Sequence, residues 1–202
     1  MSALDKAHRL LAPRIAYLIG TRAPDNLPNL IPVSNLTSIS TEPQQIVLAV
    51  YRRWETHRNL RDTDGFTMSV PHIGQLEGVW KLGAKYSRYP YATNAEKIIA
   101  SGLSLDYGAS PYGPVVTDGI GWAVCQIIAK PDFGGDHGLY VAQIKHVYFN
   151  PTYLNPDGTP RRDVRPVMQI TGNAFTTAAD VHAMPYYHQG PNSAASGNGD
   201  IR

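Results

Sequence analysis

Side chains that suit a phosphate gather just beyond one strongly apolar run of this sequence. The run Ile46–Tyr51 is followed within eight positions by Arg52, Arg53, Thr56 and Asn59. Guanidinium, hydroxyl and amide groups are the donors that an anionic phosphate needs. The spacing therefore predicts an anion site at the end of a strand.

A second segment, just before that run, passes from apolar to polar residues. Leu30–Asn35 begins with Leu-Ile-Pro-Val and ends with Ser-Asn, and a polar turn around Thr41-Glu42-Pro43 leads on to the run. We expect the two strands to pair and to hold a flat aromatic ligand, because backbone N–H groups at a strand end can meet acceptors at a ring edge. The whole stretch Asn29–Leu60 thus predicts most of a site for flavin mononucleotide (FMN).

Composition excludes several other classes of protein. The chain has 202 residues, 43% hydrophobic and 17% charged, with a formal net charge of +2. This charge is too small for a nucleic-acid or membrane-surface protein, so neither partner is expected. The single Cys125 excludes an internal disulfide, and its apolar neighbours favour a small core residue over a reactive thiol.

Targeting signals are also absent from the sequence pattern. No apolar stretch reaches the roughly 18 residues that a membrane helix needs. The N-terminal segment with Asp5, Lys6, His8 and Arg9 lacks the apolar region of a signal peptide. The expected location is therefore the cytoplasm.

Motifs of the common catalytic classes do not occur. The seven histidines show no H-E-x-x-H spacing, and no metal site is expected. There is no G-x-G-x-x-G after a strand, no P-loop and no G-x-S-x-G elbow. These absences leave the stretch described above as the strongest functional signal.

The elements that must position this stretch are mostly strands. Alternation and turn residues predict strands over Arg14–Thr21, Asn29–Asn35, Ile46–Tyr51, Phe66–Val70, Gly121–Lys130, Gly138–Phe149 and Val167–Thr171. Helical spacing or capping residues predict helices over Thr56–Arg61 and Ile73–Leu82 and from Thr93 to Gly102. We interpret residues 1–188 as a single all-β barrel domain with a few helices, and residues 189–202 as a flexible tail.

Several segments in order resemble the flavin reductase-like family of the FMN-binding split barrel, most closely its flavoredoxin-like branch. No single segment is specific for this family. The order of the segments and their near-correct spacing over Pro13–Phe175 are specific for it. The segments are Asn29–Pro43, Thr56-His57-Arg58-Asn59-Leu60, Gly65–Pro71, Gly83-Ala84-Lys85, Glu96-Lys97-Ile98 with Gly102-Leu103, Gly135–Ile144, Arg165-Pro166-Val167 and Gly172–Phe175.

This resemblance implies a six-stranded Greek-key split β-barrel that forms a homodimer, with FMN at the subunit interface. It places one group of residues along the flavin ring, a second group at the phosphate and one residue at the chemistry. The ring positions are Pro32, Val33, Ser34, Asn35 and Leu36, and the phosphate positions are Arg52 and Thr56, with Asn59 as a neighbouring polar position. Lys97 is a second cation for the phosphate or the ring edge, Lys85 lies in a loop that could cover the ligand, and Tyr51 is the cofactor position where the family often has Arg. The catalytic position is His137.

Two departures from the family pattern leave alternatives open. Family members often carry Arg where this chain has Tyr51, and Arg53 is the candidate to compensate. Ala142 replaces a usual Gly. Lys97 could equally be an exposed helical lysine, and His137 a turn histidine satisfied by Asp136 or Asp132. Loop aromatics such as Trp54 suit ring stacking, a substrate pocket or a dimer interface, and we favour the interface for most.

The function that follows is an FMN-dependent oxidoreductase, expected to be an NAD(P)H:flavin reductase. Hydride would pass from NADH or NADPH to the flavin, and reduced flavin would serve a second acceptor, for instance a partner monooxygenase. Two alternatives remain: an FMN-binding electron carrier without a nicotinamide site, and a pocket reused for a specific organic substrate.

Overall fold

Seven antiparallel strands form the main sheet of the computed structural model, which describes residues 4–83, 91–179 and 182. In spatial order they are β3 (Pro28–Val33), β2 (Tyr17–Arg22), β6 (Gly65–Val70), β9 (Gly121–Ala129), β10 (His137–Phe149), β5 (Gln44–Tyr51) and β4 (Leu36–Thr41). The mostly β architecture expected from the sequence is confirmed, and this sheet has one strand more than the six expected.

Two small sheets and several short helices complete the described chain. The three-stranded sheet consists of β1 (Arg14–Ile15), β11 (Met168–Thr171) and β12 (Ala174–Thr176), and the two-stranded sheet of β7 (Leu105–Asp106) and β8 (Val115–Val116). The α-helices are α1 (Glu55–Asp62), α2 (Leu76–Leu82) and α4 (Asn94–Ser101), and the 3-10 helices are η1 (Leu4–Leu11), η2 (Ile73–Gln75) and η3 (Pro151–Tyr153).

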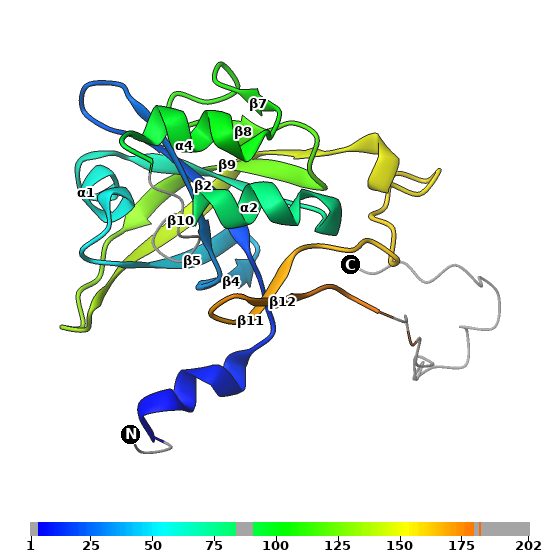
Figure 1. Ribbon diagram of the computed structural model, residues 1–202, viewed down its shortest axis with the longest axis horizontal. Helices are drawn as coiled ribbons and strands as arrows, with labels where there is room; N and C mark the ends of the chain where they lie inside the picture. The colour runs from blue at the N-terminus through cyan, green and yellow to red at the C-terminus, as the bar shows by residue number, and fades with distance from the viewer. Residues whose placement is uncertain (1–3, 84–90, 180–181, 183–202) are drawn as a thin grey trace.

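Two hydrophobic cores lie on opposite faces of the main sheet. Successive side chains of a strand point to opposite faces, and on β2 the neighbours Leu18 and Ile19 are both fully buried. Ile19 belongs to the core inside the barrel, together with Leu48 and Val50 of β5. Leu18 belongs to the outer core beneath α2 and α4, which lie together across the sheet (Figure 1).

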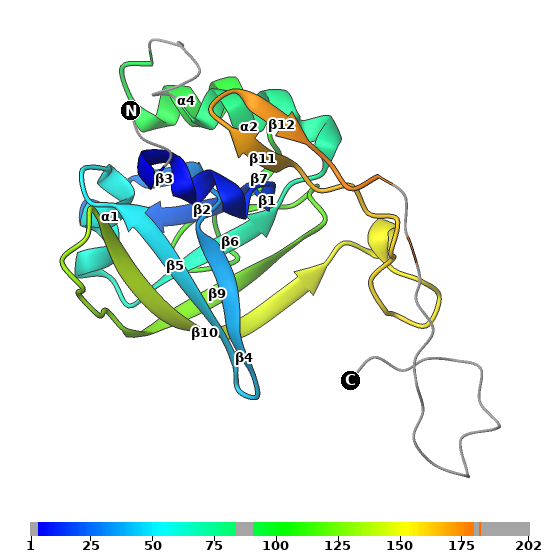
Figure 2. The same ribbon diagram turned by 90° about the horizontal axis from the view of Figure 1, so that it is seen from below.

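The predicted pairing of the two ligand-holding strands is wrong. β3 pairs with β2, whereas β5 pairs with β10 on one side and β4 on the other. The cause is Leu36–Thr41, which the sequence analysis left out of its strands although its β-branched residues suit a strand. This segment forms a hairpin with β5 that projects from the barrel (Figure 2) and occupies the edge of β5.

The end of β3 nevertheless reaches β5. The backbone N–H of Ala49 donates to the carbonyl oxygen of Asn35 at 2.8 Å. This contact continues the β4–β5 pairing by one residue, because Leu36 lies opposite Leu48, and it brings the polar residues after β3 beside the end of β5. The two segments of the predicted site are therefore adjacent in space without being paired along their length.

The predicted helices are present, and the residues expected at the two ends of α4 cap it. The side chain of Thr93 accepts from the backbone N–H of Glu96 at the start of α4, and Gly102 ends the helix with φ +66°, a conformation that favours glycine. The predicted helix over Ile73–Leu82 is present as η2 followed by α2. Helix α1 extends Thr56–Arg61 by one residue at each end.

Candidate functional site

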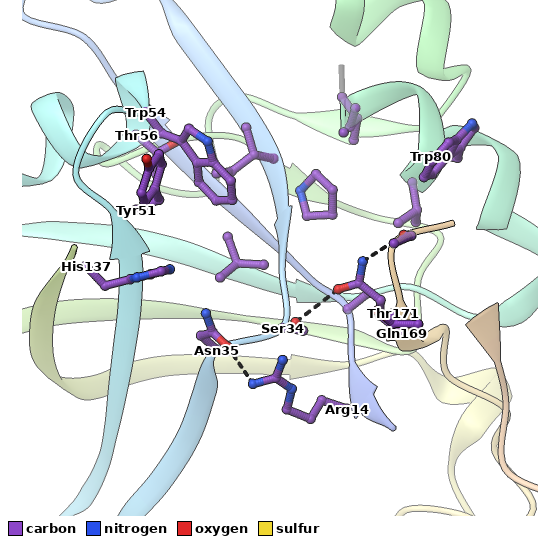
Figure 3. Close-up of a pocket in the computed structure, with 18 of the residues that line it drawn as sticks. Arg14, Ser34, Asn35, Tyr51, Trp54, Thr56, Trp80, His137, Gln169 and Thr171 are labelled. Atoms are coloured by element: carbon purple, nitrogen blue, oxygen red, sulfur yellow. Dashed lines mark hydrogen bonds between the residues drawn. The ribbon is translucent and has the colours of Figure 1, made fainter. Parts of the chain in front are cut away.

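A cavity of about 1060 Å³ opens where β3 ends, α1 begins and the β11–β12 hairpin folds back. Its volume is at the upper end of the range for cofactor and ligand sites. Figure 3 shows Tyr51, Trp54 and Thr56 on one side of it and Trp80, Gln169 and Thr171 on the other. The cavity is thus built from segments that lie far apart in the sequence.

The predicted ring positions line this cavity with one exception. Pro32, Val33, Ser34 and Asn35 all contribute to its wall. Leu36 does not line it and packs instead against the barrel core. The strand end that was predicted to lie along a flat ligand therefore faces the cavity.

Aromatic rings lie on the side of the cavity next to the start of α1. The Tyr51 and Trp54 rings meet edge to face with centroids 5.9 Å apart, and the imidazole of His137 lies 5.6 Å from the Tyr51 ring. His137 Nδ1 is 2.6 Å from Asp136 Oδ1, and this hydrogen bond lowers the pKa of the Asp136 carboxyl. The carboxylate orients the imidazole, which lines the cavity beside Tyr51.

A buried polar network joins α1, α4 and β3 at the base of the cavity. Asn29 on β3 donates from Nδ2 to the hydroxyl oxygen of Thr56 at 2.7 Å and accepts from Lys97 Nζ at 3.2 Å. Behind it, Asn59 donates to Thr21 at 3.0 Å and does not line the cavity. Thr56 and Lys97 therefore face the cavity from a rigid support.

Lys97 is a buried cation that has no carboxylate partner in the part of the chain that the structure describes. Its side chain is 6% exposed, and no carboxylate of the described residues lies within 4.0 Å of it. Burial lowers the pKa of Lys97 to about 8, and Glu55 opposes this shift only in part. A buried charge in this state favours a bound anion.

The other charges of the cavity add to this excess of positive charge. The carboxylates that line it are Glu55, which lies 3.9 Å from Arg58, and Asp136, which pairs with His137. Cations from several elements also line it, namely Arg9, Arg14, Arg53, Arg58 and Lys97. The described part of the cavity is therefore suited to a ligand with more than one negative charge.

Arg52 is directed away from the cavity. Its Nη2 lies 2.5 Å from Asp132 Oδ1 and its Nε donates to the carbonyl oxygen of Gly135 at 2.7 Å. Tyr51 lies opposite His137 in the ladder, so the next residue points toward the turn between β9 and β10. Arg53 lines the cavity instead. Lys85, the remaining predicted position, lies outside the described residues.

The sequence analysis missed some residues that line or support the cavity. Asn29 was quoted only as the start of a strand, although a buried amide in an apolar strand needs partners and is itself a signal. The other missed residues come from the ends of the chain or from α2, and nothing local marks them: Arg14, Trp80, Gln169 and Phe175.

Other kinds of site find no support in the described ranges. No group of three His, Cys, Asp or Glu side chains there is placed to hold a metal ion. No described helix is long and apolar enough to cross a membrane. Cys125 is buried, and burial raises the pKa of its thiol to about 12, so the thiol is unreactive at neutral pH.

Comparisons with known proteins identify the family and the fold. A family model described as "Flavin reductase like domain" matches residues 9–167. Among solved structures, flavoredoxin of Desulfovibrio vulgaris is 20% identical with a TM-score of 0.71, covering 86% of this chain and 91% of its own. The 2-nitrobenzoate 2-nitroreductase of Pseudomonas fluorescens is 19% identical with a TM-score of 0.76, covering 96% of each chain.

A third structure of the same fold is an NADH:FAD oxidoreductase of Streptomyces globisporus, 15% identical with a TM-score of 0.68, covering 89% of this chain and 95% of its own. At these identities the structures establish the fold, and the expected split barrel is confirmed. The family model covers well over half of the sequence. The chain therefore belongs to the flavin reductase-like domain family and is a flavoprotein of the oxidoreductase class.

Proposed function

We propose that the protein is an FMN-dependent oxidoreductase that takes hydride from NADH or NADPH. The observation that carries the proposal is Lys97, a buried ammonium group beside the Thr56 hydroxyl with no carboxylate at hydrogen-bonding distance among the described residues. A phosphate supplies the missing negative charge. A base or sugar without phosphate would leave the ammonium group uncompensated.

The phosphate fits the groups around the start of α1. Thr56 accepts from Asn29, and its own hydroxyl proton remains available to donate. The first N–H groups of a helix have no intrahelical acceptor, and the side chain of Trp54 at the N-cap makes no capping hydrogen bond to them. Arg53 and Lys97 add positive charge from two further directions. Helix N-termini with such side chains bind phosphate well.

The flavin ring fits the remaining wall on the same side. The backbone of Pro32–Asn35 supplies a flat strand end, and Tyr51 and Trp54 supply aromatic surface. The chemistry that bound FMN supplies is the acceptance of hydride from a nicotinamide and the delivery of electrons to a second acceptor. The protein contributes position and charge.

His137 is proposed to handle a proton or a hydrogen bond at the second reactant. Its Nδ1 is held by Asp136 at 2.6 Å, so Nε2 is the nitrogen left to contact a ligand. The Tyr51 ring limits the rotation of the imidazole. An imidazole nitrogen can donate or accept a hydrogen bond, which suits this task.

Anaerobic stopped-flow spectroscopy tests the proposal. Mixing the FMN-loaded protein with NADH or NADPH should bleach the flavin absorbance rapidly, with one nicotinamide preferred. Slow bleaching by both nicotinamides, combined with ready reduction by dithionite, would contradict it and identify an electron carrier. Transfer from reduced flavin to a partner monooxygenase is the proposed use of the electrons.

A homodimer is part of the proposal, because Val47, Ala49 and Tyr51 on the outer face of β5 are apolar and only half-buried in the single chain. Sedimentation velocity should show a dimer that retains FMN. A monomer that retains FMN would contradict the interface model.

An organic substrate is a second candidate for the final acceptor. The cavity extends well beyond the groups assigned to FMN, as far as Trp80 and the β11–β12 hairpin. One protein of the same fold is a 2-nitrobenzoate 2-nitroreductase, so the fold accommodates organic substrates elsewhere.

A further inference from the structure

One wall of the cavity is a row of side chains across the three-stranded sheet. Arg14 of β1 lies opposite Gln169 of β11, and Gln169 lies opposite Phe175 of β12. Directly opposed residues of antiparallel strands project to the same face, and all three line the cavity. The next row, formed by Ile15, Met168 and Thr176, does not line it.

Aromatic surface marks one end of this row. Trp80 of α2 meets Phe175 edge to face, with ring centroids 5.8 Å apart, and both rings line the cavity. Neither ring is fully buried. The pair therefore offers an apolar surface to a planar ligand, for which edge and face contacts between rings are favourable.

The guanidinium group of Arg14 marks the other end of the row. Arg14 donates from Nη1 to Asn35 Oδ1 at 2.6 Å, and its Nε is buried without a hydrogen-bond partner. No carboxylate of the described chain forms an ion pair with it. A guanidinium group has five N–H donors. The Nε donor is covered by protein, and the donors on Nη1 and Nη2 beyond the Asn35 contact remain for a ligand.

The middle of the row is already fixed. The Oε1 atom of Gln169 accepts from the Ser34 hydroxyl at 3.1 Å, and its Nε2 donates to the carbonyl oxygen of Gly172 at 3.1 Å. The side-chain amide of Gln169 thus links the β11–β12 hairpin to the end of β3, and both its oxygen and its nitrogen are hydrogen-bonded within the protein. Strands lie about 4.8 Å apart, so the aromatic and cationic ends are separated by roughly 10 Å at the backbone.

We propose that this row, formed by Trp80, Phe175, Gln169 and Arg14, is a second subsite of the cavity that binds a planar aromatic carboxylate. The ring lies against Trp80 and Phe175, and the carboxylate takes the open N–H groups of Arg14. Arg suits this contact because its planar fork matches a carboxylate in two parallel hydrogen bonds. This inference rests on the proposed function, because the subsite opens into the proposed flavin cavity.

The row is distinct from the proposed phosphate site. Lys97 contacts Asn29 at the start of β3, whereas Arg14 contacts Asn35 just beyond its end. Six residues of extended chain span roughly 20 Å at about 3.3 Å per residue. The two anionic groups, phosphate and carboxylate, are thus bound at opposite ends of the strand that supplies the ring surface.

Titrations with small probes test the subsite on the full-length, FMN-loaded protein. Benzoate, benzamide and cyclohexanecarboxylate are added in turn, and binding is read from the flavin absorbance spectrum and from tryptophan fluorescence. Benzoate should bind about tenfold more tightly than benzamide, which lacks the charge. It should also bind several-fold more tightly than cyclohexanecarboxylate, which lacks the aromatic ring.

Variants then assign the contacts. Arg14→Gln should remove the preference for benzoate over benzamide, and Phe175→Leu the preference for benzoate over cyclohexanecarboxylate. Arg162→Gln, which removes an exposed guanidinium outside the cavity, should leave both preferences unchanged. Thermal melting of each variant shows whether it is folded. The comparison of the three probes on the unsubstituted protein tests the inference even if a variant does not fold.

Three results would overturn the inference. If benzoate and benzamide bind equally tightly, the carboxylate does not contact Arg14. Loss of FMN affinity in Arg14→Gln without added probe assigns Arg14 to the flavin. Loss of NADH or NADPH binding in that variant, with benzoate binding unchanged, assigns the row to the nicotinamide. Failure of the proposed function appears separately, as absence of FMN binding before any probe is added.

Discussion

Lys97 stands out because burial and charge conflict at this side chain. It is 6% exposed, its Nζ donates to Asn29, and no carboxylate of the described residues neutralises it. Burying an unpaired charge is unfavourable because the charge loses its hydration, and a bound ligand of opposite charge offsets this free energy. The residue therefore links the stability of the empty chain to its affinity for an anion.

Replacing this lysine should separate the two properties. Lys97→Met keeps the length of the side chain and removes the charge, so FMN affinity should fall about 10- to 100-fold with the loss of a charged hydrogen bond. The flavin-free protein should become more stable, because the buried uncompensated charge is gone. Isothermal titration with FMN and chemical unfolding without it measure the two effects.

The matched control is Lys145→Met, which removes an exposed lysine on β10. It should change neither FMN affinity nor stability appreciably. If Lys97→Met binds FMN as tightly as the unsubstituted chain, the phosphate does not lie at Lys97.

The pH dependence of stability offers an independent test of the same residue. The pKa of Lys97 is lowered from 10.5 to about 8 in the folded protein. Between these two values the unfolded chain binds more protons than the folded chain, so the stability of the flavin-free protein should rise with pH across this window. The full shift corresponds to roughly 3 kcal/mol.

Urea unfolding at several pH values, with and without FMN, measures this dependence. Bound phosphate raises the pKa of the lysine, so the rise should become smaller in the FMN complex. The rise in stability with pH should also be missing in Lys97→Met. A rise of equal size in that variant would assign the effect to other groups.

Helix α1 carries Thr56, and its position depends on a contact with β10. His57 Nδ1 lies 2.7 Å from the hydroxyl oxygen of Tyr140, and the Tyr140 hydroxyl group donates to the carbonyl oxygen of His57 at 3.1 Å. Burial, followed by the charges of Arg52 and Arg61, lowers the pKa of His57, and burial raises that of Tyr140 to about 12. Both groups are therefore neutral at neutral pH and hold the helix by hydrogen bonds.

Gly138 makes this contact possible. A Cβ atom at this position would lie 2.5 Å from ring atoms of His57. Gly138→Ala should therefore push α1 away from β10, cost roughly 1–3 kcal/mol of stability, and weaken FMN binding through Thr56. Urea unfolding and an FMN titration measure the two losses.

Gly135→Ala is the matched control, because nothing lies within 4 Å of a Cβ placed there. It should behave like the unsubstituted protein. Unchanged FMN affinity in a folded Gly138→Ala protein would show that the site does not depend on this support of α1.

Elements with strong local signals were predictable from the sequence. The capping residues Thr93 and Glu96 and the terminal Gly102 fixed α4, and the long apolar strands fixed β9 and β10. The segment Leu36–Thr41 was missed as a strand because its polar residues resemble a loop. It is half exposed at the edge of the sheet, where burial leaves little pattern.

The site was predictable where short segments of the sequence carry the family pattern. Pro32–Asn35, Tyr51, Thr56, Lys97 and His137 come together at the cavity as the resemblance implied, and their contacts with FMN remain a prediction. The direction of Arg52 was not predictable, because it depends on Asp132 across a turn between other strands. The row of Arg14, Gln169 and Phe175 depends on strand register between the two ends of the chain.

Across the whole molecule, the barrel and its outer helices bring an excess of positive charge to one cavity. The two hydrophobic cores lie on either side of β2 and β3, and the cavity forms where these layers end. A formal net charge of +2 is modest, yet the cavity lining contains more cations than carboxylates. The positive charge on which the proposed phosphate site depends therefore arises from the fold and is not visible in the composition.

The most direct test of the account compares FMN with riboflavin, which has the same ring but no phosphate. Titration calorimetry of the flavin-free protein should give about 100-fold or greater preference for FMN, as expected when a phosphate makes several charge-assisted hydrogen bonds. Equal affinity for the two flavins, or no binding of either, would contradict the claim that Lys97 and the start of α1 bind a flavin phosphate.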